Sequence, residues 1–437
     1  MRKLVGMSLA LALAVNSQAA LARSGDSSAG KSGGKGAMTK IAVVKANKKP
    51  MVEKYLLEGN LAKGEVDLTA RLESHPKDDQ ARFGLGVLQF LQAVEGLSQD
   101  LYRYGLRNVG EDRPRLPMLN MPITTNPDSE SIDYQKWRGL IDRFCLKVTA
   151  AEATLAQVTD TDVQLALHFG LIKLDFTGKK DAEQKQGLWK VFANLTRHKT
   201  VTEAQSSRFY IKFDRGDVHW LRGYCNVFAA VCNMYLAHDS KEMFDRTGFL
   251  LFRKVDSAYP DLGRDTRIAG RMEHIGDLLD FVAMIHLVSW DVVEPQRMEA
   301  ALHNMEAVIA QSRETWRFIM AETDDDQEWL PNPRQTGVIP GANVSEEMVA
   351  SWAGIMDESE MILSGRLLLP FWRGDGTRGI NLRKVFLEPR RFDLVLWIQG
   401  GAALPYLERG PLTHGSTWRE LRSEFGHEFP GFALWFN

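Results

Sequence analysis

The sequence predicts a mainly α-helical protein built from antiparallel helical hairpins, with a few short strands and an irregular, Trp-rich C-terminal region. Two segments carry this prediction, because their apolar residues are spaced alternately by four and three positions. The first runs from Ile268 to Ser289 and the second from Met298 to Ile319. Such spacing places one apolar stripe along each helix. Only a short connection around Pro295 separates the two segments, so we expect them to form an antiparallel hairpin.

The first 22 residues are typical of a secretory signal peptide. Arg2 and Lys3 give a charged start, residues 4–15 are apolar, and Ala20-Leu21-Ala22 offers small residues for cleavage after Ala22. The apolar run is shorter than the roughly 20 residues that a helix needs to cross a bilayer. The sequence therefore predicts an exported protein, periplasmic or secreted, with no transmembrane segment once the signal is removed.

Residues 23–49 are rich in Gly, Ser and Lys and predict a flexible basic linker. Within it, residues 25–32 match the GxxxxGK[ST] pattern of phosphate-binding loops. Neither the preceding strand nor the following helix that such a loop requires is present, so no nucleotide cofactor is expected. Loss of Arg2 and Lys3 with the signal changes the formal net charge from −2 to −4. This balance argues against a nucleic-acid partner.

Helical patterns begin at Met51. Tyr55, Gly59 and Pro76, followed by the pair Leu85-Gly86, have spacings that resemble the tetratricopeptide repeat. The resemblance covers about two units, residues 51–108, and implies paired antiparallel helices. The sequence departs from the family pattern at Gly64 and Arg71, where alanines are usual, and at Gln89, where an aromatic residue is usual. Two repeats bury too little surface to be stable alone, so these helices are expected to pack on the rest of the chain.

The remaining elements follow in order. Residues 109–130 contain several prolines and predict a loop. A helical body covers 131–322, with helices at 132–156, 160–174 and 217–237 and an isolated strand at 208–213. The region 323–437 is expected to pack on this body. It should contain a helix from Ser345 to about Leu363 and a short helix capped by Asn381. Residues 392–406 fit either a helix or a buried strand.

Three cysteines are present. Cys225 and Cys232 lie seven positions apart in a helical pattern, about 10.5 Å along the axis, and therefore cannot pair with each other. Both fall on an apolar stripe, so buried free thiols are the expected state. Pairing of Cys145 with one of them remains the alternative.

The candidate binding residues gather after the helix that ends near Ala321. Asp324, Asp325, Asp326 and Glu328 follow the C-terminal end of that helix, where negative charge is unfavourable. Either a mobile loop tolerates them, or a cation or Arg334 neutralises them. Trp329 adjoins these acids and would complete a surface for a sugar or a cationic partner. The interpretation we favour is that Trp329 instead anchors the loop onto the body.

His286 is a further candidate because it occupies the apolar stripe of its helix and is expected in the core. The nearby acids Glu273, Asp277 and Asp280 should lie on the outer face of that helix. Asp214 and Asp217 are explained as helix-start residues. The loop from Asp175 to Gln186 lacks the ligands of a calcium loop, and no catalytic residue, metal site or cofactor is predicted.

The leading functional hypothesis is an exported helical scaffold or protein-interaction protein of the cell envelope, with a protein or an envelope polymer as partner. The sequence leaves the oligomeric state open. Motifs of high specificity for enzymes are absent from the sequence. The alternative is an exported hydrolase that acts on glycans or peptides through carboxylates in a Trp-lined groove.

Overall fold

The computed structural model describes residues 49–107, 123–179, 185–188, 209–263, 273–325, 328–338 and 344–413. Side chains in the helix that begins at Glu273 are described from Leu279 onward. The predicted signal peptide and nearly all of the predicted linker lie outside these ranges. Within them the chain is mostly helical, as the sequence predicted. No helix in the described ranges combines the length and the apolar character needed to cross a membrane.

Three helices open the described chain: α2 (Met51–Glu58), α3 (Leu61–Ser74) and α4 (Asp79–Arg103). Gly59 ends α2 with a φ of 62°, in the left-handed region that favours glycine. A Cβ at Gly59 would lie 3.0 Å from the carbonyl oxygen of Lys173. The turn at Pro76 separates α3 from α4, and the Asp78 side chain accepts a hydrogen bond from the Ala81 amide to start α4.

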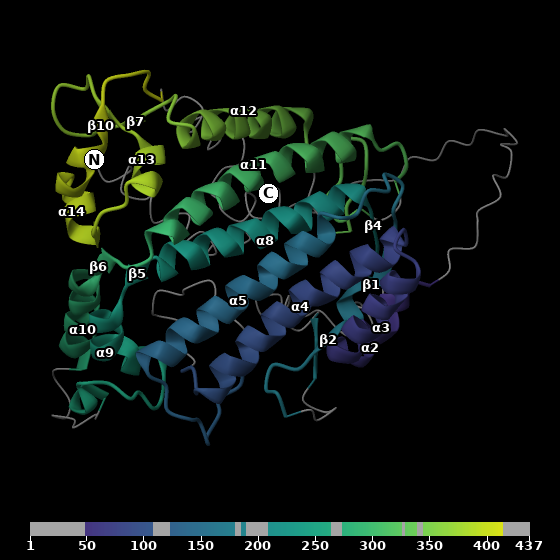
Figure 1. The fold of residues 1–437 in the computed structure, drawn as a ribbon, viewed down its shortest axis with the longest axis horizontal. Coiled ribbons are helices and arrows are strands. Elements are labelled where there is room, and N and C mark those ends of the chain that lie inside the picture. Colours follow the sequence, from purple (N-terminus) through teal and green to yellow (C-terminus); the bar gives the residue numbers. More distant parts are fainter. Residues whose placement is uncertain are drawn as a thin grey trace, which may run out of the picture.

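Five long helices form a row that positions the rest of the molecule. In Figure 1, α4 is followed side by side by α5 (Tyr134–Leu155), α8 (Arg215–Leu236), α11 (Pro295–Ala321) and α12 (Glu346–Leu363). The helix predicted from Ser345 is confirmed, and the Ser345 hydroxyl accepts a hydrogen bond from the Met348 amide. One apolar core joins side chains from all five helices, including Leu88, Leu155, Leu221, Leu302 and Trp352. Packing between successive helices therefore holds the row together.

The strand predicted at 208–213 is present but not isolated. β4 (Tyr210–Phe213) pairs antiparallel with β1 (Leu165–His168), so that His168 lies opposite Tyr210. The helix predicted over 160–174 is therefore wrong. This segment instead forms β1, the 3-10 turn η2 (Phe169–Leu171) and β2 (Lys173–Leu174), which pairs with β3 (Gln186–Gly187). The pairing partners are distant in sequence, and local periodicity does not reveal them.

The predicted hairpin of residues 268–319 is also wrong. α10 (Glu273–Leu287) contacts α9 (Lys241–Leu251), whereas α11 packs against α8 and α12. Between α10 and α11 the chain forms β6 (Ser289–Val292), the central strand of a small sheet with β5 (His238–Asp239) and β9 (Phe392–Asp393). This strand redirects the chain and separates the two helices, which also leaves much of the α10 stripe exposed. The 3-10 turn η4 (Pro260–Gly263) follows α9.

After α12, the C-terminal region consists of short elements at one end of the helical row (Figure 1). β7 (Leu369–Pro370), β8 (Gly379–Ile380) and β10 (Leu407–Glu408) form a sheet with β8 in the centre. The predicted Asn381-capped helix is confirmed as α13 (Leu382–Leu387). After β9, residues 392–406 continue as α14 (Leu394–Gln399) and the 3-10 helix η5 (Gly401–Tyr406). The segment that periodicity left open is thus mainly helical.

Candidate functional site

The start of α8 carries two carboxylates fixed by the backbone. Asp214 follows β4 and accepts hydrogen bonds from the amides of Gly216 at 2.7 Å and Asp217 at 3.3 Å. In return, the Asp217 carboxylate accepts from the Asp214 amide at 3.0 Å. This capping box confirms the helix-start role that the sequence predicted for both acids. It also buries Asp217, whose exposed fraction is only 8%.

Two further carboxylates reach Asp214 from the end of α11 and the loop after it. Oxygen atoms of Asp214, Glu322 and Glu328 lie within 4.8 Å of one another. Glu328 is buried and Glu322 is half-buried. Two segments that are distant in sequence, the start of α8 and the end of α11 with its following loop, therefore bring like charges together where water screens them poorly.

Polar side chains of the 328–338 loop hold this arrangement in place. Asn332 donates to the Ile319 carbonyl oxygen at 2.9 Å, and Gln335 donates to the Glu322 carboxylate at 3.1 Å. Arg334 donates to the backbone carbonyls of Met320 and Glu322 rather than to a carboxylate. These bonds satisfy the carbonyls at the C-terminal end of α11 and fix the loop against the helix.

The pKa of Glu322 is raised to about 10, mainly by burial and then by the charge of Asp214 and its hydrogen bond with Glu322. Burial also raises the pKa of Asp217 well above its usual range, with the Asp214 charge as the second cause. Near neutral pH Glu322 is therefore protonated and donates a hydrogen bond to Asp214. Carboxylate oxygens of this kind also suit a hard divalent cation. Acidic side chains alone do not define a cation site, and we assign none.

The acids predicted after α11 separate in the structure. Of the three acids in this group that the structure describes, Glu328 alone joins the carboxylate cluster. The exposed Asp325 accepts hydrogen bonds from the Thr336 amide at 2.7 Å and hydroxyl at 2.6 Å, and these bonds lower its pKa. Asp324 is exposed, and Asp326 lies outside the described residues. The loop is thus tied by specific hydrogen bonds.

Trp329 lies in the core and anchors the loop, as the favoured interpretation predicted, and it does not form the surface platform. Its exposed fraction is 9%, and its ring contacts Phe169, Phe213 and Trp220 at centroid distances of 5.6, 6.5 and 5.7 Å.

The prediction for His286 is wrong. It was expected in the core but is exposed on α10, because the helix does not pack against α11.

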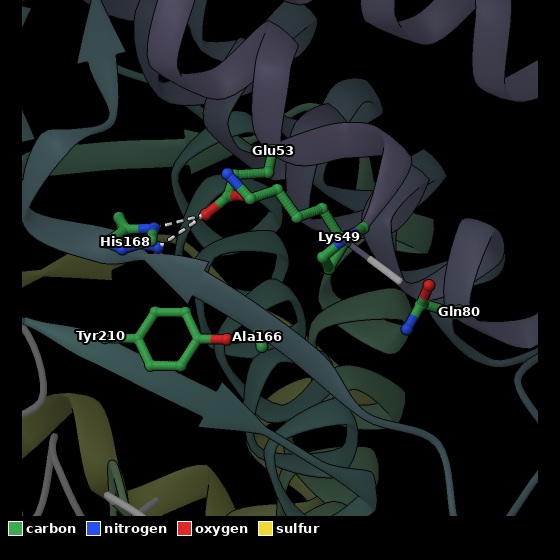
Figure 2. Close-up of a pocket in the computed structure, with 7 residues that line it drawn as sticks. Lys49, Glu53, Gln80, Ala166, His168 and Tyr210 are labelled. Atoms are coloured by element: carbon green, nitrogen blue, oxygen red, sulfur yellow. Dashed lines mark hydrogen bonds and ion pairs between the residues drawn. The ribbon is translucent and has the colours of Figure 1, made fainter. Parts of the chain in front are cut away.

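A small cavity lies at the edge of the β1–β4 pair (Figure 2). The buried Glu53 carboxylate accepts from the His168 amide at 3.2 Å and contacts the imidazole Nδ1 at 2.7 Å. Tyr210 packs against the imidazole with ring centroids 4.8 Å apart, and Lys49 and Gln80 also line the cavity. A carboxylate-oriented imidazole resembles part of a general-base site. The cavity volume of about 50 Å³, however, is close to that of one or two waters rather than a sugar or peptide.

Exposed apolar side chains gather on two contacting helices, α10 and α14, and on η5, which contacts α14. We call this set the apolar corner. Its members have exposed fractions between 42% and 61%, and they are Leu279, Phe281, Val282, Val395, Leu396, Ile398 and Leu404. Sequence analysis missed this surface because it assigned the α10 stripe to the core.

Exposed arginines flank the apolar corner. Arg390 and Arg391 lie immediately before β9 and α14, and the Arg373 side chain lies beside Gly400, between α14 and η5. Arg391 forms a long ion pair with Asp291 at 3.4 Å. Apolar area with a basic margin is typical of interaction surfaces.

Comparison of the chain with protein families, with curated proteins and with solved structures gave no match.

Proposed function

We propose that this protein is an exported helical scaffold that binds another protein of the cell envelope through the apolar corner. The observation that carries the proposal is the gathering of seven exposed apolar side chains on α10, α14 and η5. Most soluble proteins keep contiguous apolar patches small, because each exposed Å² costs free energy. A surface of this kind is explained when a partner covers it.

The rest of the architecture supports a scaffold. The tetratricopeptide-like helices α2, α3 and α4 continue into the row α5, α8, α11 and α12 (Figure 1). Rows of antiparallel helices present extended, rigid surfaces in many binding proteins. Here the row supports the C-terminal elements α14 and η5, which carry part of the apolar corner.

The chemistry of the corner favours an amphipathic, acidic segment of a partner protein. Apolar side chains of the partner would cover Leu396 and Ile398, and its carboxylates would meet Arg373 and Arg390. Such charges mainly increase the association rate and select the partner, while apolar burial supplies most of the affinity.

The test is capture of envelope proteins by the tagged mature chain after mild crosslinking in cells. The double substitution Val395→Glu with Ile398→Glu should reduce the yield of the recurrent partner at least tenfold, because it places two charges in the apolar contact. Leu146→Glu is the matched control, since Leu146 is 63% exposed on α5, away from the corner. The control should capture as the unchanged protein does. Both variants should keep the melting temperature, because the replaced side chains are exposed.

Equal capture by the corner variant and the unchanged protein would overturn the proposal. Binding of the purified protein to vesicles of anionic phospholipid, lost in the corner variant, would assign the surface to lipid instead. The hydrolase alternative is supported by the proton-sharing pair Asp214 and Glu322. Hydrolysis of an envelope glycan or peptide by the unchanged protein, but not by the Glu322→Gln variant, would support the hydrolase alternative.

A further inference from the structure

Two cysteines from neighbouring helices meet in the core. Cys145 lies on α5 and Cys232 on α8, with exposed fractions of 5% and 1%, and their thiols are hydrogen-bonded to each other. The Cys145 sulfur also lies 4.0 Å from the carbonyl oxygen of Ala229, which is about one helical turn before Cys232. Both cysteines belong to the same apolar cluster, whereas Cys225 belongs to another.

We propose that Cys145 and Cys232 form a disulfide that joins α5 to α8 when the chain folds in an oxidising compartment. The inference rests on the export that is part of the proposed function. Among the three cysteines we select Cys145 and Cys232, because their thiols are already in contact and need little backbone movement to reach the S–S bond length. Cys225 lies about 10.5 Å along α8 from Cys232 and remains a thiol.

The oxidation requires a disulfide donor, such as a thiol–disulfide oxidoreductase or oxidised glutathione. One cysteine attacks the donor as a thiolate and forms a mixed disulfide, releasing a donor thiolate. The second cysteine, also as a thiolate, then displaces the remaining donor sulfur. Each cysteine loses one proton and one electron, and the donor disulfide is reduced to two thiols.

Burial determines when the bond forms. In the folded chain a donor cannot reach either sulfur, so oxidation should accompany folding rather than follow it. Refolding of the denatured, reduced chain with oxidised and reduced glutathione should therefore yield the disulfide. The same buffer added to folded, reduced protein should oxidise it much more slowly.

The test uses the full mature chain, refolded in this way and then denatured with an alkylating reagent in the absence of reductant. The intact mass should show one alkylated thiol and the loss of two hydrogen atoms. Cys225→Ser should show no alkylated thiol, and Cys232→Ser should show two. Three alkylated thiols in the unchanged protein, or a disulfide that persists in Cys232→Ser, would overturn the proposal.

Peptide mapping of the unchanged protein without reduction provides a second readout that does not depend on any variant folding. A crosslinked peptide pair containing Cys145 and Cys232 is expected, and a pair containing Cys225 would contradict the assignment. Protein isolated from its native cells distinguishes a failure of the Cys145–Cys232 pairing from a failure of the proposed export. A disulfide that forms in refolding but is absent from cells would count against export and leave the pairing intact. Absence in both would reject the pairing itself.

Discussion

The carboxylate of Asp79 holds two distant parts of the chain together. It is buried in the first turn of α4 and accepts three hydrogen bonds, from the Thr159 amide at 2.6 Å, the Thr159 hydroxyl at 3.0 Å and the Asp160 amide at 2.8 Å. It is also paired with Arg82. Burial alone would raise the pKa of Asp79, but these hydrogen bonds outweigh it and lower the pKa. One ionised side chain therefore fixes the turn that follows α5 against the start of α4.

Replacing Asp79 by Ala should lower the free energy of unfolding by about 2–4 kcal/mol, because it leaves the Thr159 and Asp160 amides and the largely buried Arg82 side chain without their acceptor. Chemical denaturation with urea measures this change. Asp162→Ala in the neighbouring turn is the control, since Asp162 is exposed, and it should change stability by less than about 0.5 kcal/mol. Similar losses for both variants would show that the Asp79 contacts contribute no more than an exposed turn residue.

At the scale of single elements, close helix packing depends on Gly86. A Cβ at this position of α4 would lie 2.5 Å from a Leu155 methyl carbon on α5. Gly86→Ala should therefore destabilise the protein by about 1–3 kcal/mol through overpacking. Gly96 is the matched control on the same helix, because its added Cβ would meet only the flexible end of Lys147. Gly96→Ala should stabilise by up to about 1 kcal/mol through helix propensity. Thermal melts compare the stability of the Gly86→Ala and Gly96→Ala variants. A higher melting temperature for Gly86→Ala would contradict the close contact between Gly86 and Leu155.

Elements whose signals are local were predictable, and those that depend on distant partners were not. Ser345 and Asn381 cap their helices as predicted because a side-chain oxygen needs only the amides of the next turn. β1 was mistaken for a helix because its pairing partner, β4, lies beyond a long intervening segment. The apolar stripe of α10 was read correctly as periodic but placed in the core. Periodicity identifies an apolar face and does not say what covers it.

At the scale of the whole molecule, the carboxylate cluster shows why the candidate site was only partly predictable. Asp214 and Asp217 carry a recognisable helix-start pattern, which explained them without reference to any other segment. Glu322 has no distinguishing local pattern, and Glu328 was grouped with the acids beside it in sequence. Only the packing of α11 on α8, with the loop after α11, brings Glu322 and Glu328 to Asp214.

This cluster makes the stability of the whole fold depend on pH. The pKa of Glu322 is about 10 in the folded chain and near 4.5 when unfolded. Between these values the folded state binds more protons, so the contribution of Glu322 is fully present below pH 4.5 and is lost as the pH rises through about 10. The free energy of unfolding should therefore fall from about pH 7.5 to 9.5, by at most about 1.4 kcal/mol per pH unit for this group. Glu322→Gln cannot ionise and should flatten this slope in urea titrations, while the exposed control Glu299→Gln should retain it. Equal slopes in all three proteins would show that Glu322 is ionised in the folded state.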